Sequence, residues 1–386
     1  MSELHRLTNP TIELLALGEP AHRELSFGAA RNLIFERLVE LGFRSIAVES
    51  DRVAAIMVDD YVRAGVGTLD RVLAEGFSHE FGAHPANRSL VAWMRSHNER
   101  QPPERRLAWY GFDAPMETLS APSPRRYLEQ ARDYLDRDLD LAPLLGPDVR
   151  WESAEALLHR EHSPGASAEA GRLRDVADDL LISLHARAPE LIGRSSLAEW
   201  QRVETHLKAG IALLRYHRQA AQPVEDEARW TSMCATRDVL MVENLLEIRR
   251  LEAGRGPTLV FANNLHLQRQ PSSMDLGPMR LHWNGAGAIL APRLGERYRF
   301  VAGSLGGSAR LGLEPPAPDT LEAWLQQRVD GWGLIAAAEV PRGRARSDAR
   351  PEQGYFPLDQ ETVEGADAIL HIADTTTLDP ARPVGG

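Results

Sequence analysis

The sequence is poor in two residues that carry much of enzyme chemistry. Its only cysteine is Cys234, and its only lysine is Lys208, although 44 of the 386 residues are basic. A single cysteine excludes an internal disulfide, a CxxC redox motif and a thiolate-rich metal site. A single lysine within a polar helical stretch argues against Schiff-base chemistry and against a phosphate-binding P-loop. The residues left for catalysis are His, Asp, Glu, Arg, Ser and Tyr.

Basic charge is also scarce relative to acidic charge. The chain has 55 acidic residues and a formal net charge of −11, which argues against a nucleic-acid-binding surface. No basic run precedes a long apolar stretch at the start, and no segment is apolar enough to span a bilayer. We therefore expect a cytoplasmic protein that binds neither nucleic acid nor membrane.

The first third of the chain alternates between strand-like and helix-like patterns. Short apolar runs at 11–18, 45–48 and 107–112 predict strands covered on both faces. Helical periodicity at 24–41 and 88–98 separates these runs. This βαβ-like order predicts an α/β fold whose sheet is at least partly parallel.

The middle of the chain differs in character. Long amphipathic helical patterns dominate it, including 168–186, 197–218 and 228–252. Strand patterns then return at 258–264, 288–292, 298–302, 333–338 and 368–373. We predict one α/β core interrupted by a helical insertion, with bounds 1–121 for the first part of the core, 122–254 for the insertion and 255–386 for the second part.

Polar, ionisable residues follow four of the predicted strands. They are Glu19 and His22, then Glu49 and Asp51, then Asp113, and finally Asn263 and His266. Because ligands bind beyond the carboxyl ends of strands in open α/β sheets, these side chains predict one polar cleft. Asp51 by itself is more simply explained as a helix cap.

One helix carries polar residues on the face that should be buried. Arg237 and Asn244 interrupt the apolar stripe that includes Trp230, Met241 and Ile248. An unpaired buried arginine is costly, so Arg237 requires a carboxylate or a cleft. Both a structural ion pair and a fixed cation facing the cleft satisfy that requirement.

The remaining histidines do not form a recognisable motif. His79 and His84 are five residues apart, which does not place two imidazoles on one helical face for zinc. His159 and His162 lie in a charged segment and are expected on a solvated face. The absence of GxSxG argues against a serine nucleophile elbow.

Five short motifs in order resemble the erythromycin esterase family. They read LGEPAH, GFRSIAVESD, WMRSHN, YGFD and FANNLH, and the ending GADAILHIADTT resembles the closing strand of the family. The resemblance runs from residue 17 to about residue 300. It implies a central mixed β-sheet with a helical region over the cleft at its carboxyl edge, and metal-independent opening of a macrolactone by water.

The resemblance also implies roles for individual residues. His22 matches the histidine treated as the general base, Glu19 the acid three residues before it, and Glu49 the acid that ends the second strand. Arg31 falls on an arginine of the first helix, His266 on the second histidine of the late motif, and Arg237 in the region of an arginine-aspartate helix. The late motif of the family usually reads His-Asn-x-His, whereas here Asn263 replaces its first histidine. Arg23 stands where a small residue commonly follows the catalytic histidine.

The leading hypothesis is a hydrolase of an ester or macrolactone, in natural-product biosynthesis or antibiotic resistance. A neutral imidazole with a pKa near ~6.5 can take a proton from water. Either Glu19 or Glu49 would orient His22, and either Arg237 or Arg31 would stabilise the oxyanion. We expect catalysis by His22, Glu19, Glu49, His266 and Arg237, and substrate binding by Arg31, Asn263, Asp113, Arg23 and Asn244.

Three alternatives remain open from the residues alone. The same groups could catalyse a non-hydrolytic tailoring reaction, such as elimination, dehydration or cyclisation, which the asparagine at 263 motivates. Glu19, His22, Glu49 and His266 could instead bind a divalent ion, or the cleft could hold a macrocycle without turnover. The favoured reading expects a macrolide or other small natural product as the partner, no cofactor, no metal and a monomeric protein.

Overall fold

The computed structural model describes residues 2–117 and 119–384. Its main sheet has seven strands in the order β3-β2-β4-β1-β7-β9-β8. The strands are β1 (Leu14–Glu19), β2 (Ser45–Asp51), β3 (Ala108–Asp113), β4 (Thr258–Asn263), β7 (Tyr298–Leu305), β8 (Trp332–Ala336) and β9 (Ala368–Ile372). All neighbours are parallel except β8, which is antiparallel to β9. The predicted α/β fold with a mixed sheet is confirmed.

The apolar runs of the sequence form strands that are buried on both faces. Every residue of β1 is buried. Since successive side chains of a strand point to opposite faces, Leu15 and Leu17 join one core while Leu14 and Ala16 join the other. This explains why the run is continuously apolar instead of alternating.

The first core lies between the sheet and the helices that connect the early strands. These helices are α2 (Ser26–Glu40), α3 (Ala55–Ala64), α4 (Leu69–Glu75) and α5 (Pro85–Glu99). The opposite face is covered by residues of α13 (Asp226–Leu251) and α15 (Ala286–Leu294). Three other short helices precede strands of the sheet. They are α1 (Ser2–Leu7) before β1, α16 (Leu321–Gln326) before β8 and α17 (Gln360–Gly365) before β9.

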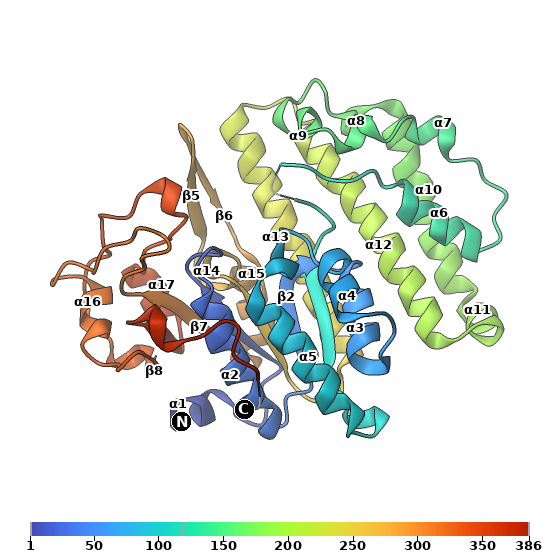
Figure 1. Ribbon diagram of the computed structural model, residues 1–386. Coiled ribbons are helices and arrows are strands. Elements are labelled where there is room, and N and C mark those ends of the chain that lie inside the picture. The colour runs from blue at the N-terminus through green and yellow to red at the C-terminus, as the bar shows by residue number, and fades with distance from the viewer. Residues whose placement is uncertain (1, 118, 385–386) are drawn as a thin grey trace.

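The chain between β3 and β4 is helical, and Figure 1 shows it in green and yellow beside the sheet. Its elements are α6 (Arg125–Tyr134), α7 (Ala142–Leu145), α8 (Val149–Glu152), α9 (Glu155–Leu158), α10 (Ala168–Ala186), α11 (Ala188–Arg194), α12 (Leu197–Ala220) and α13. Helices α6, α10 and α12 share a core that includes Leu128, Leu173 and Leu207. The proposed domain bounds at 122 and 254 stay a prediction.

Helix α13 joins this helical region to the sheet. Met241, Leu245 and Ile248, in its second half, pack on the face of the sheet. Trp230 and Met233, in its first half, pack in a different core beyond the strand ends. The middle of α13 therefore lies at the carboxyl edge of the sheet, and Arg237 is located there.

One expectation for the later part of the chain is wrong, and one element was not predicted. The run 288–292 is not a strand but lies inside α15, because a five-residue apolar run does not distinguish a strand from a buried helix face. The hairpin of β5 (Ser272–Leu276) and β6 (Met279–Trp283) was not expected. Its turn contains Gly277, which has a φ of 58°, and its buried Leu281 and Trp283 pack in the core that contains Trp230.

No helix in the described part of the chain combines the length and the apolar character needed to cross a membrane.

Candidate active site

Four adjacent parallel strands, β3, β2, β4 and β1, end along one edge of the sheet. Glu19 is the last residue of β1, Asp113 of β3 and Asn263 of β4, and Glu49 lies two residues before the end of β2. Residues that are far apart in the sequence therefore meet because the topology places their strand ends together. This is the edge predicted from the sequence, and we call the charged side chains that meet there (Glu19, His22, Glu49, Asp113, Arg237 and His266) the cluster.

A bulge in β2 shapes this edge at Glu49. The pairing of β2 with β3 shifts register between Val48 and Asp51. Gly111 on β3 faces the bulge, and a Cβ there would lie 2.4 Å from the carbonyl oxygen of Asp51 and 2.5 Å from that of Ser50. Only glycine fits at that distance, so Gly111 permits the bulge, a feature that commonly re-aims a side chain next to a functional site.

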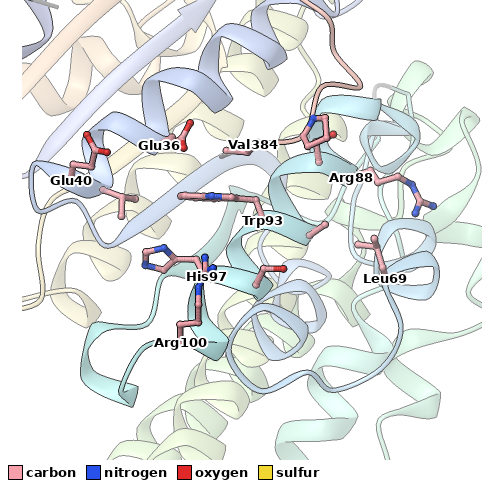
Figure 2. A pocket seen from close by; sticks show the side chains of 13 residues that line it. Glu36, Glu40, Leu69, Arg88, Trp93, His97, Arg100 and Val384 are labelled. Atoms are coloured by element: carbon pink, nitrogen blue, oxygen red, sulfur yellow. The ribbon is translucent and has the colours of Figure 1, made fainter. Parts of the chain in front are cut away.

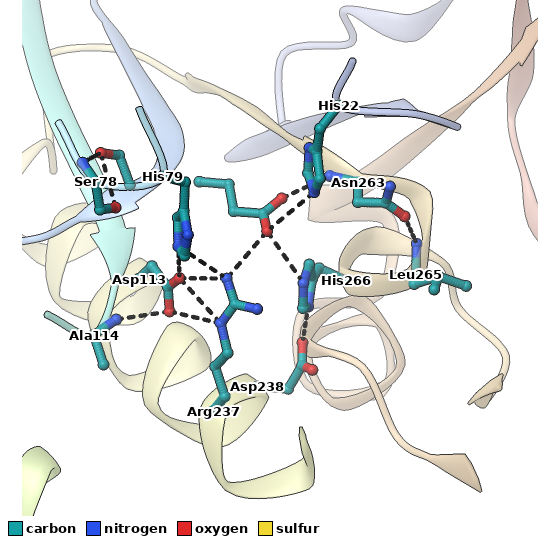
Figure 3. Close-up of polar contacts among 12 residues, drawn as sticks. His22, Ser78, His79, Asp113, Ala114, Arg237, Asp238, Asn263, Leu265 and His266 are labelled. Carbon is teal, nitrogen blue, oxygen red and sulfur yellow. Dashed lines mark hydrogen bonds and ion pairs between the residues drawn. The ribbon is translucent and has the colours of Figure 1, made fainter. Parts of the chain in front are cut away.

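The carboxylate of Glu49 is the centre of the cluster. Its Oε1 lies 3.6 Å from Nε2 of His22, 3.3 Å from Nε2 of His266 and 3.2 Å from Nη2 of Arg237 (Figure 3). Its Oε2 accepts a hydrogen bond of 2.9 Å from the backbone N–H of Asn263. Burial by itself would raise the pKa of Glu49, but the two histidines and the arginine outweigh it and hold the pKa well below its ordinary value. Glu49 is therefore a buried anion.

His22 is the imidazole of the cluster that reaches furthest into solvent. It follows β1, and its Nδ1 lies 2.8 Å from Oε1 of Glu19. Its side chain is 35% exposed, against 9% for Glu19 and 10% for His266. Burial lowers the pKa of His22, but the charge of Glu49 and the hydrogen bond with Glu19 outweigh that effect, so the pKa is raised. For Glu19 burial acts in the opposite direction and raises the pKa of the carboxyl, despite its contact with His22.

His266 is a buried cation. It lies on α14 (Asn264–Leu267), directly after β4, and its Nδ1 is 2.9 Å from Oδ1 of Asp238. The two carboxylates, Asp238 and Glu49, overcome the effect of burial and raise the pKa of His266 to about 10. Asp238 is held in turn by Nε1 of Trp283, at 2.7 Å, and by the backbone N–H of Ala286. Both ring nitrogens of His266 therefore face the carboxyl groups of acidic residues, Nδ1 that of Asp238 and Nε2 that of Glu49.

The sequence left two roles open for Arg237, a structural ion pair and a fixed cation facing the cleft. The contacts of Arg237 fit both roles. Its Nε lies 3.0 Å from Oδ2 of Asp113, and its Nη2 contacts Asp113 and Glu49. It also lines an open cleft, with a side chain that is 22% exposed. Despite burial, Arg237 lowers the pKa of Asp113, and the two carboxylates raise the pKa of the guanidinium. Arg237 is thus an ion-paired cation at the wall of the cleft.

The structure adds His79, which the sequence did not indicate. Its Nε2 lies 3.4 Å from Oδ2 of Asp113, and its Nδ1 lies 3.1 Å from Oε2 of Glu117. His79 and Glu80 have φ angles of 56° and 58°, a left-handed conformation that is uncommon outside glycine. These two residues turn the chain into the short helix Phe81–Ala83 and direct the ring of His79 toward Asp113 (Figure 3). A loop conformation of this kind has no periodicity that a sequence could reveal.

Asp238 is the other group that was not predicted. It follows Arg237 directly on α13, and neighbouring helical residues point in directions about 100° apart. Arg237 therefore reaches Asp113 and Glu49, while Asp238 reaches His266. In the sequence, only the adjacent Arg237 and Asp238 could have indicated this role for Asp238. That Asp238 faces a histidine becomes clear only once β4 places His266 beside α13.

Two hollows adjoin His22, and Phe81 lines both of them. The outer cleft has a volume of about 670 Å³ and is lined by His22, Glu49 and Arg237, among others. The inner pocket has a volume of about 30 Å³, room for about one water, and is also lined by His22 and Glu49. The ring centroid of Phe81 lies 5.4 Å from that of His22 and 5.6 Å from that of His79.

Arg31 lines the inner pocket from α2. Its guanidinium donates to the side-chain oxygens of Asn32 and Asn87 and lies 4.9 Å from the ring centre of Phe261. Burial lowers its pKa to about 10, although Glu19 opposes this. It is thus a buried cation without a carboxylate in hydrogen-bonding contact within the described residues.

The other residues predicted to bind substrate occupy different places. Asp113 is fully buried behind Arg237, and the exposed Arg23 lines the rim of the outer cleft. Asn263 is buried; its side-chain oxygen accepts from the N–H of Leu265, while its Nδ2 has no hydrogen-bond partner among the described residues. Asn244 lies outside both hollows and donates to the carbonyl of Phe112. The expectation that Asp51 caps the next helix is wrong: its Oδ1 accepts from the backbone N–H groups of Val53 and Ala54 in the turn before α3, and the N-cap of α3 is Ala54.

A further hollow of about 720 Å³ lies elsewhere, on the outer surface of α2 and α5 (Figure 2). Trp93, His97 and Val384 are among its lining residues. None of the residues at the carboxyl edge discussed above lines it. The candidate site is therefore the cleft at the strand ends.

The donor groups at the site do not form a metal-binding set. Across residues 2–117 and 119–384, no three His, Cys, Asp or Glu side chains are placed to hold one metal ion together. The ring nitrogens of His22 and His266 already lie close to carboxylates, at the distances given above. The chemistry that this arrangement supports is proton transfer by an imidazole beside buried charges.

Comparisons with known proteins identify the family and the fold of this chain. A family model described as erythromycin esterase matches residues 38–376. A histidine-to-asparagine mutant of the erythromycin esterase EreC, in its open conformation, is similar in structure with a TM-score of 0.69 and 20% identity, covering 97% of this chain and 93% of that chain. No significant match was found among curated proteins.

Two other solved structures share the fold. A protein from Bacillus cereus has a TM-score of 0.68 and 18% identity, covering 96% of this chain and 90% of that chain. A succinoglycan biosynthesis protein has a TM-score of 0.63 and 14% identity, with the same coverage. Because the family model spans most of the chain, this protein belongs to the erythromycin esterase family.

Proposed function

We propose that this protein hydrolyses an ester or lactone bond, with His22 as the general base that activates water. The observation that carries the proposal is the position of His22 between two carboxylates and the cleft. Its Nδ1 is held by Glu19 at 2.8 Å, and its Nε2 faces Glu49 at 3.6 Å in a ring that is 35% exposed. Glu49, His266 and Asp113 are far less exposed, which makes His22 the accessible base.

Glu19 sets the tautomer of His22. When the ring is neutral, the Nδ1–H is donated to Glu19 and the lone pair of Nε2 is available to a water molecule. His22 takes one proton from that water, and the oxygen forms a bond to the carbonyl carbon of the substrate. The tetrahedral intermediate then breaks its carbon–oxygen bond to the alcohol, and His22 returns the proton to the departing alkoxide. Glu19 and Glu49 stabilise the imidazolium that exists between these steps.

Arg237 is the proposed donor to the oxyanion. Its Nε and Nη2 are engaged by Asp113 and Glu49, whereas its Nη1 makes no hydrogen bond to another described residue. Two N–H donors at the cleft wall are thus available to a substrate oxygen, and their orientation is fixed by the ion pairs. Asp113 and His79 act as positioning residues for Arg237, and Asp238 does so for His266.

The family and the dimensions of the cleft support a proposal for the substrate class. A volume of about 670 Å³ falls in the range of clefts that bind small molecules. We propose a macrolactone or another natural-product ester, with Arg23 at the rim of the outer cleft contributing to substrate binding, while Arg31 lines the inner pocket, which has room for about one water. Water activation by an imidazole needs no metal, so we expect turnover to persist after dialysis against a chelator.

The reaction is tested by incubation in ¹⁸O-labelled water with a panel of macrolactones and simple esters. Hydrolysis places one ¹⁸O in the carboxylate of the product, which mass spectrometry detects as a gain of about 2 Da over the product formed in ordinary water. An unlabelled product would show that the same base catalyses elimination, dehydration or cyclisation, the alternative that Asn263 motivates. Binding without any product would show that the cleft only sequesters its ligand.

A further inference from the structure

Another cavity, separate from the hollows described above, lies next to Asp113 between the sheet edge and the helical region. It has a volume of about 350 Å³ and lies between α12 and α13, next to the residues that follow β2 and β3. Asp113 is among its lining residues and Arg237 is not, and Arg52 donates its backbone N–H to the carbonyl of Asp113 at 3.0 Å. The mechanism proposed above uses none of the other residues that line this cavity.

Arg52 is the exceptional residue of the cavity. It is only 5% exposed, yet its guanidinium makes no hydrogen bond to another residue of the described chain. Its nearest acid is Glu247, whose Oε1 lies 3.6 Å from Nη2, beyond hydrogen-bonding distance. The ring of Tyr110 lies 5.3 Å away, beside the guanidinium. Buried polar groups are normally paired, and an arginine fork with free donors suits a planar anion.

The neighbouring charges leave an excess of one positive charge. Glu247 lies 2.6 Å from Nζ of Lys208, and Glu204 lies 2.8 Å from the same nitrogen. Glu204 also pairs with Arg250 at 3.5 Å. The connected group therefore has three cations, with Arg52 included, and two carboxylates. The other charged residues of the wall are paired separately, Glu243 with Arg215 and Asp113 with Arg237. A ligand that neutralises the excess positive charge of the connected group carries one negative charge.

Part of the remaining cavity wall is apolar, and the rest is polar and includes Thr205, Arg215, Glu243 and Asn244. Leu181, Ile211, Leu240 and Leu246 line the apolar part together with two alanines of α12. Ordered water could satisfy Arg52, but water gains little from the leucine and isoleucine side chains. Such walls favour a ligand with an apolar body attached to its charged group.

We propose that this cavity binds a monocarboxylate with an apolar body, such as an aryl- or alkyl-carboxylic acid. The carboxylate accepts hydrogen bonds from the guanidinium of Arg52, and the apolar body packs between α12 and α13. Because Arg52 and Asp113 are linked through the backbone, the ligand is bound next to the residue that holds Arg237. The site is independent of whether the cleft catalyses hydrolysis.

The single lysine of the chain provides a selective probe of this site. In protein labelled with ¹³C-lysine, all lysine signals come from Lys208, which lines the cavity. We expect 3-phenylpropionate to shift these signals saturably, while 3-phenylpropanol, which lacks the charge, does not. The Arg52→Gln variant should weaken the dissociation constant for 3-phenylpropionate by about ten-fold or more, as expected when a charged partner is lost.

Two further variants keep the test decisive. Arg172→Gln alters an exposed arginine on α10 and should leave the affinity unchanged. Ile211→Trp fills the cavity from its wall without altering Arg52, and it should abolish binding even if Arg52→Gln does not fold. The proposal is overturned if the alcohol binds as tightly as the acid, if Ile211→Trp or a folded Arg52→Gln binds like the wild type, or if no saturation occurs below about 20 mM.

Discussion

Arg237 and Asp113 form an ion pair between residues that are 124 positions apart in the sequence. Nη2 of Arg237 lies 2.5 Å from Oδ2 of Asp113, and Nε lies 3.0 Å from the same oxygen. Asp113 ends β3 and is fully buried, whereas Arg237 lies in the middle of α13. The pair attaches the helical region to the sheet edge and fixes the guanidinium beside Glu49.

Breaking this pair should destabilise the protein. Arg237→Gln leaves Asp113 as a buried carboxylate without its cation, and loss of one partner of a buried pair costs about 3–5 kcal/mol. Urea denaturation of the variant and the wild type measures the difference. The matched double variant Arg237→Gln/Asp113→Asn removes both charges and should recover part of the loss. If the losses of the two single variants simply add, the two residues are not coupled as the structure indicates.

Replacement of His22 should abolish most of the activity without unfolding the protein. Removal of a general base costs about 10²–10⁴-fold in rate, so kcat/KM of His22→Ala should fall by that factor. His22 is partly exposed, and the free energy of unfolding should change little. His159→Ala, on an exposed segment of the helical region, is the control and should retain full activity. Turnover by His22→Ala within a few-fold of the wild type would eliminate His22 as the base.

The pH dependence of kcat/KM should report the carboxylates around His22. The base must be neutral, and its pKa is raised by Glu49 and Glu19 against the effect of burial. Activity should therefore be lost as the pH falls through a value above 6.5, the ordinary pKa of histidine. In Glu19→Gln the imidazolium loses one of its stabilising groups, so this acidic limb should move to lower pH while the maximal rate also falls. A limb that keeps its position in Glu19→Gln would show that another group controls it.

The sequence predicted which edge of the sheet carries the site, because parallel strands must end together and polar residues followed four of them. It also identified Arg237, since a charge inside an apolar helical stripe has to be paired. It could not predict His79, whose position depends on two left-handed residues in a loop. Nor could it predict the partner of Asp238, because that contact requires the packing of α13 against α14.

The limits were similar for the fold. The continuous apolar runs of β1 and β2 were recognisable because both faces of these strands are covered. The run 288–292 is equally apolar but belongs to α15, and only tertiary packing decides between the two structures. Short-range pattern thus predicted the covered strands, but it could not distinguish a strand from a buried helix face in a short apolar run.

His266 should make the stability of the protein depend on pH above neutrality. Its pKa is about 10 in the folded protein, raised by Asp238 and Glu49 against burial, and about 6.5 in the unfolded chain. Between these values the folded state holds a proton that the unfolded state has lost. The stabilisation is therefore complete below pH 6.5 and disappears as the pH rises through 10.

A single retained proton sets the size of this effect. The free energy of unfolding should fall by about 1.4 kcal/mol for each pH unit between pH 7.5 and about 9.5 through His266 alone. Because other groups titrate in the same range, the informative quantity is the difference between the wild type and His266→Gln, measured by urea denaturation at several pH values. Asp238→Asn, which lowers the pKa of His266, should reduce the slope partially. Parallel curves for the wild type and His266→Gln would mean that His266 is neutral in the folded protein, and an imidazole able to accept a proton would then lie beside Glu49 as a second candidate base.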